Sequence, residues 1–353
     1  MVTLEELLRQ AVKMKASDLH IQQGCKPALR IQGKMHFLDN ELLTEEEVAN
    51  MLFPIMSEEE YNTFVTMGDV DMAYTLPEVS RFRVNALNQY NGRGAVFRVS
   101  PNEIPTLEGL GLPRVLETIA GFRKGLVLIT GPTGCGKSTT MAAMLRYINE
   151  SRVEHIITIE DPIEFIHPQQ KSYIEQRELG RHALTFAEAL RSSLRESPDV
   201  VMIGEMRDLD TIQQALRAAE TGHLVLATLH TTSVAQTLSR LVDVFPPDEQ
   251  SQIRSLLSGS LRAVVCQQLL PNLSGGRVAA MEIMIVNTGL SGCIREGKNT
   301  QIRSFLMMGR SEGMQTLDLH LSHLVHIREI SMETAEEYCT EFEIIKRHDD
   351  LFD

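Results

Sequence analysis

Apolar residues in the first hundred positions change their spacing several times, which predicts a small domain of mixed helices and strands. The chain is expected to open with an amphipathic helix, whose apolar positions are Leu4, Leu7, Leu8, Ala11 and Met14. Thr44 and the three acids after it are typical of a capped helix start. Strands are predicted at 19–22, 28–31 and 35–38, and antiparallel hairpins in the alternating segments between 70 and 99.

Later in the chain, continuously apolar strands alternate with helical segments. The predicted strands are 125–130, 155–160, 199–204 and 223–229. The predicted helices are the segment from Lys137 onward, 185–195 and 208–220. Apolar strands that alternate with helices indicate a parallel sheet covered on both faces. Beyond about residue 247 the pattern is mostly helical, with strands near 264–269 and 277–285.

A segment rich in proline and glycine separates the two patterns. Residues 101–113 contain three prolines and two glycines and have no apolar periodicity, which is typical of an interdomain linker. The sequence therefore predicts an α+β domain at 1–100, a linker at 101–113, and an α/β domain at 114–353 that is helical toward its end.

Composition and charge narrow the classes of function. The 353 residues carry a formal charge of −13, of which residues 331–353 contribute −6. So acidic a chain is a poor candidate for general duplex-DNA binding, where neutralising phosphates supplies most of the affinity. The five cysteines are scattered, without the paired spacing of a zinc site, and suit a reducing compartment. The chain opens without a secretory signal pattern, and no apolar run approaches the ~18 residues that span a bilayer. We expect a cytoplasmic protein that reaches the membrane through a partner.

The strongest chemical signal is a phosphate-binding loop between a predicted strand and a predicted helix. It reads G-P-T-G-C-G-K-S and matches the pattern G-x-x-x-x-G-K-[ST] in full. Its glycines allow backbone N–H groups to point at phosphate oxygens, while Lys137 reaches the β- and γ-phosphates and Ser138 offers a hydroxyl to Mg²⁺. The predicted nucleotide-binding residues are Gly131, Pro132, Thr133, Gly134, Cys135, Gly136, Lys137, Ser138 and Thr139. Cys135 is interpreted as a small-residue substitution rather than a reactive thiol.

Acidic residues follow two of the other predicted strands. Glu205 ends the apolar run 200–204, as the acid of a Walker B element does, and can order an attacking water. Glu160 and Glu164 lie at the end of strand 155–160, and strand ends of this kind face the ligand crevice. We therefore expect all three acids near the nucleotide, Glu164 sharing Mg²⁺ with Ser138, partly through water. The residues leave open whether Glu205 or Glu160 is the general base.

Two histidines and a set of arginines complete the candidate site. His223 and His230 bracket the strand after Glu205 and are interpreted as sensors of the γ-phosphate, although simple packing is an equal alternative for each. Residues 81–100 hold four arginines and no acid, and an arginine delivered from another domain or subunit can stabilise transition-state charge. Arg83 and Arg98 belong to this window, and a basic docking patch is its alternative interpretation.

Four motifs occur together in one order: GPTGCGKSTT, ITIEDPIEF, VVMIGEMRD and ETGHLVLATLHT. With ASDLHI at 16–21, RFRVNAL at 81–87, FPPDEQ at 245–250 and IREGK at 294–298, they closely resemble the secretion and pilus-motor ATPase superfamily, in its pilus-retraction branch. The resemblance implies a RecA-like ATPase domain preceded by a smaller PAS-like domain. It also implies a homohexameric ring that hydrolyses ATP with Mg²⁺ and drives type IV pilus retraction and twitching motility.

The resemblance carries roles and partners as well. It implies that Glu205 is the general base and that Arg83 and Arg98 contact the γ-phosphate. It also implies that Glu160 and Glu164 belong to an acidic motif of the family, the acidic box, and that His223 and His230 belong to a second motif, the histidine box. The partners it implies are an inner-membrane pilus platform protein and a paralogous retraction ATPase, with recruitment to the inner face of the cytoplasmic membrane, no nucleic acid and no direct membrane insertion.

Three other functions stay open at this stage. An accessory retraction subunit that binds ATP with little turnover would keep the same motifs. A type II secretion or pilus-assembly ATPase would carry a paired-cysteine zinc insert and a further N-terminal domain, neither of which this sequence shows. A RecA-like nucleic-acid motor would need stacking platforms of aromatic and basic residues, which the sequence also lacks.

Overall fold

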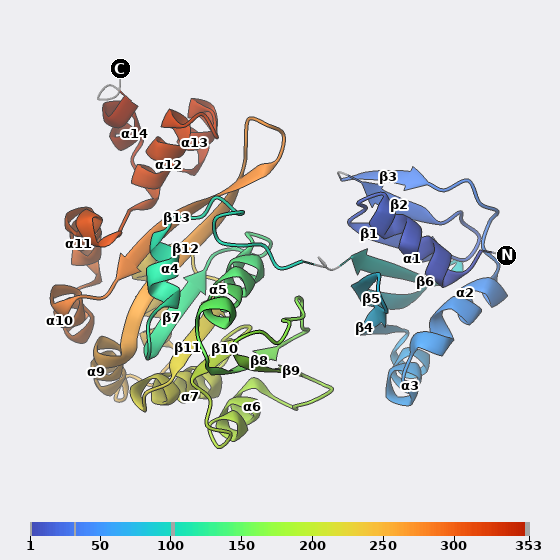
Figure 1. Cartoon of the computed structure of the whole chain (residues 1–353), viewed down its shortest axis with the longest axis horizontal. Coiled ribbons are helices and arrows are strands. Elements are labelled where there is room, and N and C mark those ends of the chain that lie inside the picture. Colours follow the sequence, from blue (N-terminus) through green and yellow to red (C-terminus); the bar gives the residue numbers. More distant parts are fainter. Residues whose placement is uncertain (1, 32, 100–102, 350–353) are drawn as a thin grey trace. The chain divides into compact units, whose positions relative to one another are not determined.

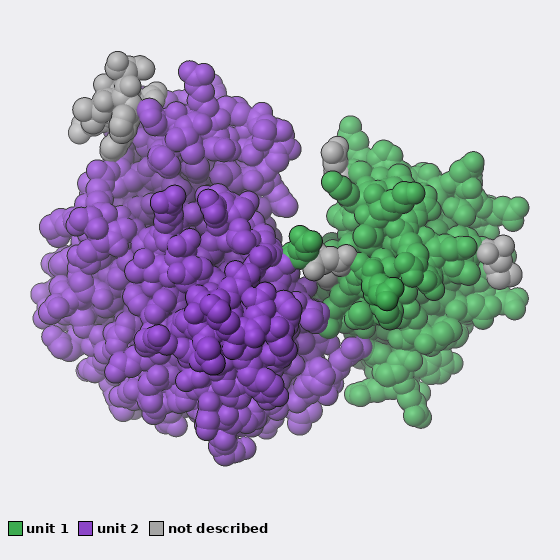
Figure 2. All heavy atoms as spheres, in the orientation of Figure 1, with its two compact units in different colours: residues 1–103 green, residues 104–353 purple. Residues whose placement is uncertain are grey.

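The computed structural model describes residues 2–31, 33–99 and 103–349 and divides into two compact units, Met1–Glu103 and Ile104–Asp353 (Figure 2). Positions 100–102, where the expected linker begins, lie outside the described residues. The rest of that segment packs within unit 2, because Ile104, Leu107 and Leu112 are buried there.

Unit 1 is an antiparallel sheet with three helices. Its elements are α1 (Leu4–Lys13), β1 (Asp18–Gln22), β2 (Ala28–Ile31), β3 (Lys34–Phe37), α2 (Glu45–Leu52), the 3-10 turn η1 (Phe53–Ile55), α3 (Glu58–Met67), β4 (Asp69–Leu76), β5 (Ser80–Gln89) and β6 (Gly92–Val99). The strand order is β3-β2-β1-β6-β5-β4 (Figure 1). Thr44 caps α2 in a capping box with Glu47, as the sequence predicts.

One face of this sheet is apolar and the other polar, because strand side chains alternate. Leu19, Phe82 and Phe97 are fully buried in a single core with residues of all three helices. On the opposite face, the adjacent residues Arg83 and Arg98 are exposed, whereas Asp18, next to Leu19, is buried. Unit 1 is thus the α+β body that the pattern predicts, while its PAS-like character stays a prediction.

Unit 2 is a mostly parallel sheet with helices on both faces. Its elements are α4 (Val115–Ala120), β7 (Gly125–Thr130), α5 (Lys137–Ser151), β8 (His155–Glu160), β9 (Tyr173–Glu178), α6 (Phe186–Ser193), β10 (Val200–Ile203), α7 (Leu209–Glu220), β11 (Leu224–Leu229), α8 (Val234–Asp243), α9 (Gln250–Ser260), β12 (Leu261–Pro271), β13 (Arg277–Ile285), α10 (Thr288–Glu296), η2 (Asn299–Gln301), α11 (Ile302–Met308), η3 (Gly309–Glu312), α12 (Leu317–His326), α13 (Met332–Tyr338) and α14 (Phe342–Asp349). No described helix has the length and apolar character needed to cross a bilayer.

The strand order of unit 2 is β13-β12-β7-β11-β10-β8-β9, with β13 antiparallel to β12 and the other neighbours parallel. Alternate residues of the central strands enter two different cores. Leu126 and Leu128 pack with α6 to α9, whereas Val127 and Ile129 pack with α4 and α5. The predicted parallel sheet with two covered faces is confirmed, and its strands β7, β11, β10 and β8 end at one common edge (Figure 1).

Sequence patterns missed strand β9. Only two of its six residues, Ile174 and Glu178, are buried, and four of the six are polar or charged, as suits the outer strand of a sheet. The continuous apolar run that identifies the central strands is therefore missing from β9, although it pairs with β8 along its whole length.

Candidate nucleotide site

The phosphate loop lies between β7 and α5, at the edge of the sheet where the parallel strands end. Every residue of β7 is buried, so the strand holds the loop's first residue firmly. Gly131, Gly134 and Gly136 have φ values of +146°, +79° and +88°, a region that residues with a Cβ rarely adopt. Gly136 also forms the N-terminal cap of α5, so the positive end of that helix's dipole faces the loop.

Gln267, on strand β12, forms a hydrogen bond with the phosphate loop. This residue was not identified from the sequence. Gln267 of β12 is buried, and its Nε2 donates to the carbonyl oxygen of Cys135 at 2.6 Å. Its Oε1 accepts from Oγ1 of Thr140 in α5 at 2.7 Å. Within the sequence, Gln267 lies 132 residues after Cys135 in a segment without any motif, so no local signal marks it.

Lys137 begins α5 and turns back over the loop. Its Nζ donates to the carbonyl oxygens of Gly131 at 2.8 Å and Pro132 at 3.0 Å. Burial lowers the pKa of Lys137, and the carboxylate charges of Glu205 and Glu164 oppose that change. Ser138 is exposed on the same first turn of the helix.

His230 connects Lys137 with Glu205. Its Nδ1 lies 3.5 Å from Nζ of Lys137, and its Nε2 lies 2.8 Å from Oε1 of Glu205. A neutral imidazole with its proton on Nε2 satisfies both contacts, because it accepts from the lysine and donates to the carboxylate. The structure therefore brings three sequence-predicted residues from three segments into one chain of contacts.

Glu205 follows β10 and is largely buried, with 18% of its side chain exposed. Its second oxygen, Oε2, accepts from Nη2 of Arg207 at 2.7 Å. Burial alone would raise the pKa of Glu205, but the hydrogen bond and positive charge of Arg207, together with the hydrogen bond from His230, outweigh burial and hold that pKa below its usual value. Arg207 is a second residue that sequence reasoning did not single out, although it stands in the quoted motif VVMIGEMRD.

Glu160 and Glu164 have different environments. Glu160, at the end of β8, is 7% exposed, and its Oε1 accepts from Thr158 at 2.7 Å and from Gln176 at 3.2 Å. Burial raises the pKa of Glu160 to about 7, despite these hydrogen bonds. Glu164 is exposed four residues after Glu160, and its charge contributes to raising the pKa of Lys137.

His223 is not at this site within its own chain, which corrects its assignment to the catalytic group. It precedes β11, and its carbonyl oxygen accepts from the amide of Gly125, the first residue of β7. The phosphate loop follows the other end of β7, about 17 Å away at about 3.3 Å per residue. Nδ1 of His223 instead lies 3.0 Å from the carbonyl oxygen of Ala218 and 3.2 Å from the hydroxyl of Thr221.

Arg83 and Arg98 are cross-strand neighbours on the polar face of the unit 1 sheet. Nε of Arg98 contacts Oδ1 of Asp18 at 2.9 Å, and Nη2 of Arg83 lies 3.7 Å from Oδ2 of Asp71. The window 81–100 contains no acid, but acids from neighbouring strands therefore pair with its arginines. At least half of each arginine side chain stays exposed, so both remain accessible to an anion.

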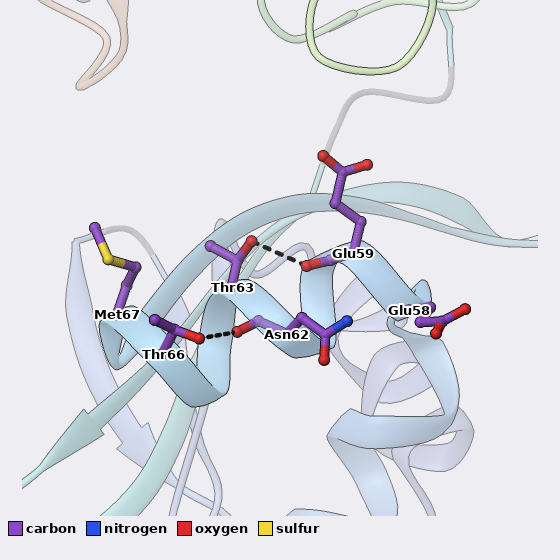
Figure 3. Close-up of a pocket in the computed structure, with 6 residues that line it drawn as sticks. All are labelled: Glu58, Glu59, Asn62, Thr63, Thr66 and Met67. Atoms are coloured by element: carbon purple, nitrogen blue, oxygen red, sulfur yellow. Dashed lines mark hydrogen bonds between the residues drawn. The ribbon is translucent and has the colours of Figure 1, made fainter.

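Two other features carry no assigned chemistry. A shallow hollow on α3 is lined by threonines whose hydroxyls already donate within the helix, Thr63 to Glu59 and Thr66 to Asn62 (Figure 3). His320 of α12 is buried and accepts from the amide of Met281 through Nδ1, and the described residues include no group of three potential metal ligands.

The comparisons with known proteins agree with this geometry. Residues 1–278 match the family model for "Type II/IV secretion system protein". The chain is 49% identical over 334 residues to the type IV pilus retraction ATPase PilT of Pseudomonas aeruginosa, which covers 95% of this chain and 97% of that one. It is 51% identical to a twitching motility protein of Neisseria gonorrhoeae over 88% of this chain and 83% of that one. The type IV pilus ATPase PilU of P. aeruginosa is 39% identical over 94% of this chain and 87% of that one.

A solved structure supports the same relationship. The crystal structure of the pilus retraction motor PilT with bound ADP superposes with a TM-score of 0.92, at 42% identity over 98% of this chain and 100% of that one. The α/β ATPase fold predicted from the sequence is thus confirmed, together with the predicted resemblance. The chain belongs to the Type II/IV secretion system protein family and, within it, to the pilus-retraction ATPases.

Proposed function

We propose that unit 2 binds and hydrolyses ATP at the phosphate loop and that this chain is the motor that retracts type IV pili. The observation that carries the proposal is the chain of contacts from Lys137 through His230 to Glu205. It joins a residue suited to hold the β- and γ-phosphates with a carboxylate suited to order water. That ATP hydrolysis drives pilus retraction is inferred from the family relationship.

Glu205 is proposed as the general base. Two donors hold its oxygens in a fixed direction, and its lowered pKa keeps it unprotonated near neutral pH. An ionised, oriented carboxylate can accept a hydrogen bond from the attacking water and place it in line with the γ-phosphorus. Glu160 is less suited to that task, because its raised pKa leaves it partly protonated near neutral pH and its Oε1 accepts two internal hydrogen bonds.

The proposed ligands of Mg²⁺ are oxygen donors at the same edge of the sheet. Ser138 lies in the first turn of α5, and Glu164 is exposed in the segment that follows β8 and acts electrostatically on Lys137. Hydroxyl and carboxylate oxygens are the donors that Mg²⁺ prefers, and it usually keeps several waters, so these residues fit the ion. When bound, Mg²⁺ neutralises charge on the β- and γ-phosphates. Residues Gly131 to Thr139 supply the remaining phosphate contacts.

Arg83 and Arg98 are proposed to act on the γ-phosphate from unit 1. Both guanidinium groups are exposed on one face, side by side across two strands. A guanidinium suits phosphate oxygens and can stabilise charge that develops during transfer. Asp18, which is buried and contacts Arg98, would hold that arginine in place.

At the level of assembly, we propose a homohexamer that docks on an inner-membrane platform protein, with a paralogous retraction ATPase as a further partner. This arrangement places a cytoplasmic chain at the inner face of the membrane without inserting it. The net charge of −13 argues against a nucleic-acid partner.

Deletion of the gene in its host tests the retraction proposal. Loss of twitching with surplus surface pili supports retraction, whereas loss of the pili themselves would indicate assembly instead. Complementation should succeed with the wild-type gene and fail with Lys137→Ala. Restored twitching with Lys137→Ala would favour an accessory subunit whose own ATP turnover is dispensable.

A further inference from the structure

We propose that Gln267 is a positioning residue for the phosphate loop, holding one peptide unit so that the amide N–H of Gly136 faces the nucleotide phosphates. The inference rests on the proposed function of the loop in binding nucleotide and adds a residue to it. Gln267 belongs to β12, which pairs with β7 in parallel register next to the loop (Figure 1).

The side chain of Gln267 is fixed at both ends of its amide. It is 2% exposed, and Nε2 donates to the carbonyl oxygen of Cys135 while Oε1 accepts from Thr140. Thr140 itself is 1% exposed in α5, and its amide donates to the carbonyl oxygen of Gly136 at 3.0 Å. A buried amide with both ends paired has one stable orientation, because any rotation would leave polar atoms unpaired in the core.

The contact with Cys135 sets the direction of the next amide. In a trans peptide the C=O and N–H groups lie in one plane and point in opposite directions. Gln267 draws the carbonyl of Cys135 toward β12, so the N–H of Gly136 in the same peptide points away from β12. Backbone N–H groups aimed inward are what allow such a loop to cradle phosphate oxygens. Without Gln267, that peptide could turn and present a carbonyl oxygen to an anion.

Two of the three glycines of the motif, Gly131 and Gly136, fit closely against Gln267. A Cβ added to Gly131 would lie 2.1 Å from the backbone oxygen of Gln267, and one added to Gly136 would lie 2.9 Å from its Nε2. Neither atom can give way readily, because the first is backbone in a paired strand and the second is held by Cys135. At Gly131 and Gly136, a side chain is therefore excluded both by the positive φ value and by the close contact with β12.

The test is the affinity for ADP of the purified full-length chain, measured by calorimetry well below the melting temperature. Gln267→Ala should raise the Kd about tenfold, which is the loss expected for one oriented hydrogen bond. Because Glu205 and His230 stay in place, kcat at saturating ATP should fall less than the affinity does. The matched control is Gln268→Ala, since this partly exposed neighbour projects from the opposite side of the strand.

A second pair of variants keeps the test decisive if Gln267→Ala folds poorly. Thr140→Val removes the hydroxyl that orients Gln267 and should weaken ADP binding, whereas Thr140→Ser should restore it. The double variant Gln267→Ala/Thr140→Val should be no weaker than Gln267→Ala alone, because Thr140 acts through Gln267.

The variant Lys137→Ala distinguishes a failure of the proposed role of Gln267 from a failure of the proposed nucleotide site. Loss of ADP binding in Lys137→Ala, with normal binding in both Gln267→Ala and Thr140→Val, would overturn the role of Gln267 and leave the nucleotide site intact. Normal ADP binding in Lys137→Ala would instead overturn the proposed nucleotide site itself.

Discussion

Replacing Glu160 by Gln is expected to stabilise the protein by an amount that grows as the pH rises from about 5 to about 7. The side chain is 7% exposed, and burial raises its pKa from an ordinary 4.5 to about 7. Glutamine has the same shape, and its Oε1 can accept the hydrogen bonds that Thr158 and Gln176 now donate. The substitution therefore removes the cost of a buried charge and keeps these two hydrogen bonds.

The sign and size of this stability difference follow from the linkage between folding and proton binding. Between pH 4.5 and 7 the folded chain binds the Glu160 proton more tightly than the unfolded chain does, so the free energy of unfolding falls as the pH rises through this window. At about 1.4 kcal/mol per pH unit, the group costs on the order of 3 kcal/mol by pH 8. Glu160→Gln should match the wild type near pH 4.5 and exceed its stability by that amount at pH 8.

Urea unfolding followed by circular dichroism, at several pH values between about 5 and 8, measures this difference. The matched control is Glu164→Gln, which changes an exposed acid in the segment after β8 and should keep the pH slope of the wild type. If the stability of Glu160→Gln fell with pH as steeply as that of the wild type, the buried-charge explanation would be refuted.

Two further predictions concern catalysis. Arg207→Ala should raise the pKa of Glu205, because the variant loses a hydrogen bond and a positive charge that lower this pKa. The acid limb of the pH profile of kcat/KM should then move to higher pH. An acid limb at the wild-type position would contradict this prediction. Arg83→Ala and Arg98→Ala should each lower kcat by about a hundredfold while the Kd for ADP is unchanged, because ADP lacks the γ-phosphate. Arg93→Ala, which removes a contact with a glutamate elsewhere in unit 1, is the control and should keep normal turnover.

Local patterns predicted most of the unit 2 framework, because each element there is identified by its own residues. The strand 125–130 and the helix start at Lys137 agree with β7 and α5 in the structure. Strand 155–160 agrees with β8, and its apolar run reflects burial on both faces of the sheet. The phosphate loop, Glu205 and His230 follow the carboxyl ends of β7, β10 and β11. Because these strands are parallel, all three must meet at the same edge of the sheet.

The remaining site features depend on contacts between distant segments. Gln267 reaches the loop only because β12 pairs beside β7, and a glutamine within an apolar strand carries no pattern of its own. The arginine window looked unpaired because Asp18 and Asp71 come from other strands. His223 was misplaced because it lies in the same motif as His230, although a six-residue strand carries the two to opposite edges of the sheet.

The central claim is that Glu205 activates water for hydrolysis of ATP bound at the phosphate loop. Steady-state ATPase activity of Glu205→Gln, measured beside its Kd for ATP, tests it most directly. We predict that the variant binds ATP at least as tightly as the wild type and that kcat falls by at least about a hundredfold, since the glutamine cannot accept a proton. Turnover equal to that of the wild type, with normal binding, would contradict the claim.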